Sequence, residues 1–144
     1  MPHTIEEAIA SAGFISDDEH YALVKLPANA IIPAAGVLAE MNTPFSALIL
    51  DQDEITLFVI ADAVEHFSKR LRDSVVYATQ FRLITIDVEL DPQMVGFMAH
   101  ISTALAAAGV GVFPYAAYSR DHIFVPAHQF DTALQTLENL KANA

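Results

Sequence analysis

The sequence contains no cysteine. This absence excludes disulfide bonds, thiol nucleophiles and thiolate metal ligands, and it suits a protein from a reducing compartment. The fold needs no disulfide, because a chain of 144 residues buries roughly 70% of its unfolded surface when it folds. We therefore expect one compact domain, or two very small halves that share a core.

Long apolar runs are also absent. Hydrophobic residues make up 53% of the chain, but they lie in short runs such as Ala47 to Leu50, and none approaches the roughly 18 residues of a membrane span. The N-terminal stretch from Met1 to Glu7 lacks the basic and then apolar regions of a secretory signal. We therefore expect a cytoplasmic protein with no membrane partner.

Basic residues are few. Seven Lys and Arg stand against eighteen Asp and Glu, which gives a net charge of −11. An electrostatic field of this sign repels nucleic acid backbones and anionic lipid. The charge therefore predicts that nucleic acid is not a partner, although it identifies no ligand.

The sequence lacks the known catalytic and metal-binding motifs. Its five glycines form neither a phosphate loop nor a dinucleotide fingerprint, and no nucleophile elbow is present. The six histidines show no metal-ligand spacing. We expect no enzyme activity, no cofactor and no metal. A small enzyme that uses Asp121 and His122 as an acid–base pair is an alternative, and it requires both side chains in one pocket.

The pattern that is present repeats. Apolar alternation and helical stripes predict the order strand, helix, strand, strand, helix in each half. Two such halves make an α+β fold of ferredoxin-like (βαββα-type) repeats, with antiparallel sheets that carry helices on one face. The boundaries that we expect are an N-terminal helix in residues 1–15, a first repeat in residues 16–78 and a second repeat in residues 79–144.

Two details of this pattern are less regular. Asp91 and Pro92 are typical of a helix start, with a capping acid followed by proline at the first position, and Gly109 is typical of a helix end.

The second half ends in a helix and so lacks one strand of a complete ferredoxin-like unit. The runs 75–77 and 14–15 are candidates for missing edge strands, and an open edge would invite pairing with another chain.

The stretch from Phe81 to Val125 resembles a known family. Asp91–Met98 followed by Leu105–Val110 is similar to the strand, glycine-bearing loop and helix of ACT domains. Ser119–Val125 resembles a hairpin of small bacterial tandem-ACT proteins. That subgroup is related to the ACT repeats of aspartate kinases and of the cytosolic arginine sensor of the animal TOR pathway.

The resemblance implies a non-catalytic regulatory module that binds a small molecule, an amino acid, at an interface between two ACT domains. Because ACT domains pair side by side, it also implies a homodimer. The ligand-binding residues that it implies are Asp91, Gln93, Met94, Val95 and Gly96 in the strand-to-helix loop and, across the interface, Tyr118, Ser119, Asp121 and His122.

The chemistry of these residues suits an amino acid. A helix N-terminus offers free N–H groups and partial positive charge to a carboxylate, and Gly96 leaves room for close approach to the backbone. Asp91 or Asp121 could take the ammonium group. Simpler roles stay open: helix–sheet packing for Gly96, a helix cap for Asp91, a turn for Asp121 and cross-strand packing for His122.

The first half departs from this pattern. Its strand-to-helix loop, residues 27–30, contains no matching glycine. We therefore expect any ligand at sites built mainly by the second half. The alternative function is a constitutive dimerisation module without a ligand, in which the side chain of Phe97, Met98 or Phe113 fills the cleft.

Overall fold

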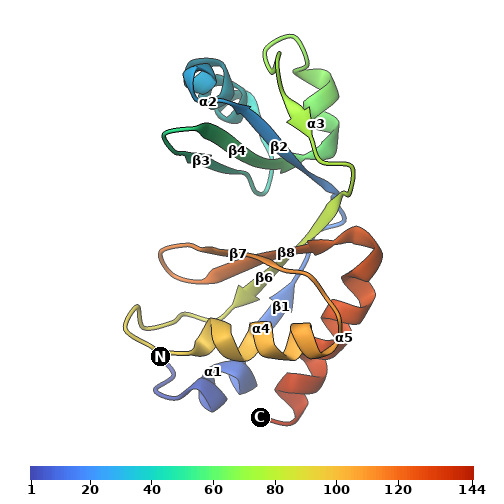
Figure 1. Ribbon diagram of the computed structural model, residues 1–144. Coiled ribbons are helices and arrows are strands. Elements are labelled where there is room, and N and C mark those ends of the chain that lie inside the picture. The colour runs from blue at the N-terminus through green and yellow to red at the C-terminus, as the bar shows by residue number, and fades with distance from the viewer. The chain divides into compact units, whose positions relative to one another are not determined.

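The computed structural model describes all 144 residues, which divide into two compact units (Figure 1). Residues 19–81 form the central unit, and residues 1–18 together with 82–144 form the terminal unit, which contains both chain ends. No helix of either unit has the length and the apolar character that would let it cross a membrane.

The terminal unit is built on a four-stranded sheet with helices on one face (Figure 1). The strand order is β1, β6, β8, β7, and β1–β6 and β7–β8 are antiparallel pairs. Its elements are α1 (Ile5–Ser11), β1 (Gly13–Ile15), β6 (Phe81–Asp87), α4 (Phe97–Ala107), β7 (Phe113–Ala116), β8 (Asp121–Pro126), the 3₁₀ turn η2 (Ala127–Gln129) and α5 (Phe130–Ala142).

Strand alternation builds the core of the terminal unit. Along β6, Ile84 and Ile86 are fully buried beneath the helices, whereas Thr85 and Asp87 on the other face are partly exposed. Ile101 of α4 and Leu137 of α5 complete this core from the helix side. The alternation of β6 and the apolar stripe predicted for α5 are therefore confirmed. The stripe predicted for α4 was Val95, Met98, Ser102, Leu105 and Ala106, and it is wrong in part, because Val95 precedes the helix and Ala106 is exposed.

The central unit has the same architecture. Its antiparallel sheet has the strand order β3, β4, β2, β5, and residues of α2, the α3 region and the inward face of the sheet form one buried core. Its elements are β2 (Tyr21–Pro27), the 3₁₀ turn η1 (Ala28–Ala30), α2 (Ile31–Glu40), β3 (Ala47–Leu50), β4 (Glu54–Ile60), α3 (Ala61–His66) and β5 (Val75–Val76). The two units together confirm the α+β fold of ferredoxin-like repeats.

Both candidate edge segments are strands. Val75 and Val76 pair with β2 of the central unit, and Gly13–Ile15 pairs with β6 of the terminal unit. Each unit thus has the four strands of a complete ferredoxin-like sheet. The expected division placed residues 1–15 apart from both repeats as a helix, whereas here they belong to the terminal unit, because β1 covers the edge of β6.

Side-chain bonds fix the chain just after β1. The Ser16 hydroxyl donates to the Leu83 carbonyl at 2.5 Å, and the Arg82 guanidinium donates to the Asp17 carbonyl at 2.7 Å. The same guanidinium lies 4.0 Å from the centroid of the Phe130 ring, a favourable cation–π distance. The N-terminal segment is therefore held to both the sheet and α5 of the terminal unit.

The helix predicted to begin at Asp91 and Pro92 begins later, at Phe97. Gly96 precedes it with φ of 93°, a left-handed conformation that ends any helical path from Pro92. The local cap-and-proline signal was therefore wrong as a helix start. Residues 88–96 form an open connection between β6 and α4, and the candidate site depends on this connection.

We expect Ile9→Ala to lower the free energy of unfolding by about 2–5 kcal/mol, because a buried isoleucine in a packed core leaves a cavity when it is truncated. Ile9 is 2% exposed and packs in the core of the terminal unit. Urea unfolding measures the loss, and amide exchange should locate it in β6 and β8. The control is Ile32→Ala in α2, because Ile32 is 79% exposed; if both variants lost the same small amount, the N-terminal segment would not belong to this core.

Candidate functional site

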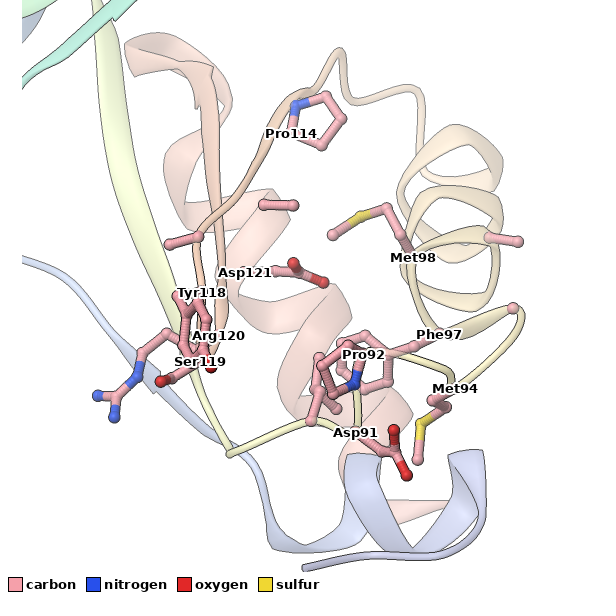
Figure 2. A pocket seen from close by; sticks show the side chains of 15 residues that line it. Asp91, Pro92, Met94, Phe97, Met98, Pro114, Tyr118, Ser119, Arg120 and Asp121 are labelled. Atoms are coloured by element: carbon pink, nitrogen blue, oxygen red, sulfur yellow. The ribbon is translucent and has the colours of Figure 1, made fainter.

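A cavity of about 610 Å³ lies in the terminal unit between the start of α4 and the β7–β8 hairpin (Figure 2). Two stretches of chain make its walls, the β6–α4 connection and the hairpin. The lining residues are Leu90, Asp91, Pro92, Met94, Gly96, Phe97, Met98 and Ala99 from the first stretch, and Pro114, Ala116, Ala117, Tyr118, Ser119, Arg120 and Asp121 from the second.

The loop before α4 is ordered by its own hydrogen bonds. The carboxylate Oδ1 of Asp91 accepts the Gln93 N–H at 2.9 Å, and the Asp91 carbonyl accepts the Met94 N–H at 2.9 Å. The Leu90 N–H donates to the Ser119 carbonyl at 3.3 Å and so joins the loop to the hairpin. Asp91 therefore shapes this loop and does not cap α4.

Gly96 lets the chain turn into α4 at a point where α1 packs closely against the backbone. Its φ of 93° is one that residues with a side chain rarely adopt. A Cβ at this position would lie 3.3 Å from Cδ1 of Ile5 in α1. The glycine thus serves both the turn and the close packing of α1 beneath the loop.

The first turn of α4 presents free main-chain donors beside the cavity. The first helical hydrogen bond runs from the His100 N–H to the Gly96 carbonyl at 3.0 Å. The N–H groups of Phe97, Met98 and Ala99 precede it and have no protein acceptor, and no side chain caps the helix. Unpaired donors and the helix dipole give this end partial positive charge.

Asp121 supplies a negative charge inside the cavity. It begins β8, and its carboxylate points into the open space (Figure 2). The structure gives this carboxylate no hydrogen bond and no ion pair. Burial raises its pKa above the ordinary value, an effect that the neighbouring His122 partly opposes. The group has lost water without gaining a protein partner.

Arg120 lines the cavity, but its guanidinium already forms an ion pair. Its guanidinium donates to Oδ1 of Asp87 on β6 at 2.8 Å, and in Figure 2 it points away from Asp121. No other lining residue is basic. A negatively charged ligand group would therefore have to meet the main-chain donors of α4.

The remaining walls are apolar. Met98 reaches from α4 toward the hairpin, and Pro114 of β7 faces it across the space (Figure 2). Ala116 of β7 also lines the cavity. Phe97 is buried in the core beneath the floor, only 4% exposed. The cavity stays open although Phe97 and Met98 border it, and Phe113 does not line it.

The structure brings together most of the residues implied by the resemblance. The members of that set that line the cavity are Asp91, Met94, Gly96, Tyr118, Ser119 and Asp121. The other three, Gln93, Val95 and His122, do not line it, and the Val95 side chain is 86% exposed. The loop and the hairpin were expected to meet across an interface between domains, whereas here they meet within one unit.

His122 lies outside the cavity because adjacent strand residues point to opposite faces of a sheet. Its Nδ1 is 2.9 Å from the Thr85 hydroxyl. Burial and the charge of Arg120 lower the pKa of His122, and Asp121 partly opposes this. Asp121 and His122 therefore do not converge on one pocket, which the acid–base alternative requires.

The sequence reasoning missed several lining residues, namely Leu90, Pro92, Ala99, Pro114, Ala116, Ala117 and Arg120. The alternation of β7 placed Pro114 and Ala116 on the same face, a signal that could have found them. Across the described chain, no group of three or more His, Asp or Glu residues is arranged to hold a metal ion.

The central unit lacks an equivalent loop. There β2 runs through Pro27 directly into η1 and α2, and the nearby cavity is smaller, about 400 Å³. Its lining includes Lys25, Asp53, Glu54 and Asp73. The two repeats therefore share a fold but differ at the strand-to-helix connection.

Comparisons with known proteins agree with this architecture. Residues 77–139 match the family model of the ACT domain, whereas a search of curated proteins found no match. A solved Vibrio cholerae protein of unknown function, described as a possible transport protein, is 24% identical with a TM-score of 0.76, and the alignment covers 96% of each chain.

Two further solved structures have the same fold. A protein from Agrobacterium tumefaciens is 18% identical with a TM-score of 0.68, over 85% of this chain and 84% of that one. The regulatory subunit of aspartate kinase from Thermus flavus is 12% identical with a TM-score of 0.69, over 89% of this chain and 96% of that one. At these identities the likeness shows the fold alone.

We expect Asp121→Asn to raise the melting temperature at pH 7. The pKa of Asp121 is raised above its ordinary 3.8, so stability falls as the pH rises from about 3.8 through the folded-state pKa, and the substitution removes that loss. The gain should shrink as the pH is lowered, because a protonated aspartic acid resembles asparagine. Thermal unfolding between pH 4 and pH 7 measures it.

The matched control is Asp18→Asn, because Asp18 is exposed in the same unit. We expect no pH-dependent gain from this variant. A lower melting temperature of Asp121→Asn at pH 7 would contradict the prediction, since it would show that the ionised carboxylate is stabilised by a neighbouring group.

Proposed function

We propose that this chain is a regulatory module that binds an amino acid in the cavity of the terminal unit, because residues 77–139 match the family model of the ACT domain. The observation that supports this most is the Asp121 carboxylate, which faces open space without a protein partner while free N–H groups border the same cavity. The solved aspartate kinase regulatory subunit with this fold supports a regulatory function.

An amino acid complements both charges of the cavity. Its carboxylate would accept hydrogen bonds from the free N–H groups of Phe97, Met98 and Ala99. Its ammonium group would pair with Asp121 and restore the contacts that this carboxylate has lost. The basic residue of the lining, Arg120, stays with Asp87.

We further propose that the chain forms a homodimer. Tyr118 at the rim of the cavity is 97% exposed and Val95 in the adjacent loop is 86% exposed. Large apolar side chains that are this exposed are candidates for contacts with a second chain. These side chains also favour the alternative function, a constitutive dimerisation module without a ligand.

The cytoplasmic location expected from the sequence stays a prediction.

We expect calorimetric titration of the full chain with the twenty amino acids to reveal at least one that binds. Asp121→Asn should weaken that binding about 10- to 100-fold, because a hydrogen bond to a charged group is worth about 1.5–3 kcal/mol. Asp18→Asn, which removes an exposed carboxylate outside the cavity, should bind as the wild type does. A flat response to all twenty amino acids on folded protein would remove the proposal.

Light scattering over a range of protein concentrations tests the homodimer. We expect dimers, and we expect Tyr118→Ser to weaken self-association because it removes an exposed aromatic side chain. Tyr77→Ser is the control, since Tyr77 is 58% exposed but lies in the central unit. A dimer that binds no amino acid would favour the alternative function. A monomer at all protein concentrations would exclude both the homodimer and the alternative function.

A further inference from the structure

We propose that the cavity selects an α-amino acid with an uncharged, apolar side chain, and that Met98, Pro114 and Ala116 form the subsite for that side chain. This inference rests on the proposed function, because it assigns Asp121 to the ammonium group of the ligand. It adds the chemical class of the ligand, which the fold does not determine.

Every charged group of the lining already has a role. Asp121 is taken by the ligand ammonium, and Arg120 is bound to Asp87 at 2.8 Å. The Asp91 carboxylate accepts the Gln93 N–H at 2.9 Å and lies apart from Asp121 and Met98 in Figure 2. A charged ligand side chain would therefore lose water without gaining a partner, which is costly.

Apolar side chains line the cavity beside Asp121. Met98 projects from α4 toward β7, where Pro114 presents apolar surface (Figure 2). Ala116 of the same strand also lines the cavity. Met is flexible and polarizable, so it adapts to apolar groups of different shape. The small Ala116 side chain leaves space beside Asp121, its register partner on β8. The space next to the ammonium position is thus apolar and adaptable.

The charge of the cavity and of the chain disfavours acidic ligands. Two carboxylates, Asp91 and Asp121, line the cavity, and the whole chain carries a net charge of −11. A second negative charge on the ligand would be repelled by the local carboxylates and by this long-range field. Aspartate and glutamate should therefore bind most weakly.

The test is a calorimetric ranking on the full wild-type chain with three groups of probes. We expect leucine, methionine or phenylalanine to bind at least about tenfold more tightly than lysine or arginine, and aspartate and glutamate to bind more weakly still. A basic or acidic amino acid that binds more tightly than every apolar one would overturn the inference.

The same ranking separates the inference from the function on which it rests. If a charged amino acid binds most tightly and Asp121→Asn abolishes that binding, the proposed function survives and the side-chain class is wrong. If none of the twenty amino acids binds to the folded chain, the proposed function itself fails and the class inference falls with it.

A substitution at Met98 tests the location of the subsite. Met98→Lys places a cation there, so we expect at least about tenfold tighter binding of glutamate relative to leucine than in the wild type. Thr103→Lys places the same charge on an exposed position of α4 outside the cavity and should keep the wild-type ranking. Unchanged relative affinities in a folded Met98→Lys variant would place the ligand side chain elsewhere, and the wild-type ranking decides the class whether or not this variant folds.

Discussion

The pairing of β1 with β6 is the interaction on which the terminal unit depends. Residues 82–144 supply three strands and two helices and end in α5, so the β6 edge of that sheet has no partner from within the repeat. Gly13–Ile15 pairs there in the register Gly13 with Asp87 and Ile15 with Thr85. Buried strand edges need such partners, because unpaired main-chain groups are costly away from water.

This pairing also reaches the candidate site. The chain that leads into β1 is α1, whose Ile9 lies in the core and whose Ile5 lies against Gly96. Gly96 in turn sets the point at which α4 begins and its free N–H groups appear. The N-terminal segment therefore supports, from below, the loop that borders the cavity, although it contributes no lining residue itself.

The sequence predicted the fold better than the site. Alternation in β6 and the apolar stripe of α5 are long enough to identify their elements, whereas β1 has three residues and shows no period. The start of α4 was misjudged because Asp91 and Pro92 form a valid local signal that the left-handed turn at Gly96 overrides. His122 was grouped with Asp121 by motif, although strand geometry separates their side chains.

The difference between the repeats follows from one local constraint. In the central unit the strand passes into its helix through Pro27 and a short 3₁₀ turn, so no extended loop stands beside the β3–β4 hairpin. In the terminal unit the nine residues between β6 and α4 include Gly96, and they open a space that the β7–β8 hairpin closes on the other side. An unpaired carboxylate such as Asp121 lowers stability in a folded protein unless a ligand pairs with it. The terminal unit thus combines an open loop with an electrostatic cost that a bound cation would remove, and the central unit has no comparable loop.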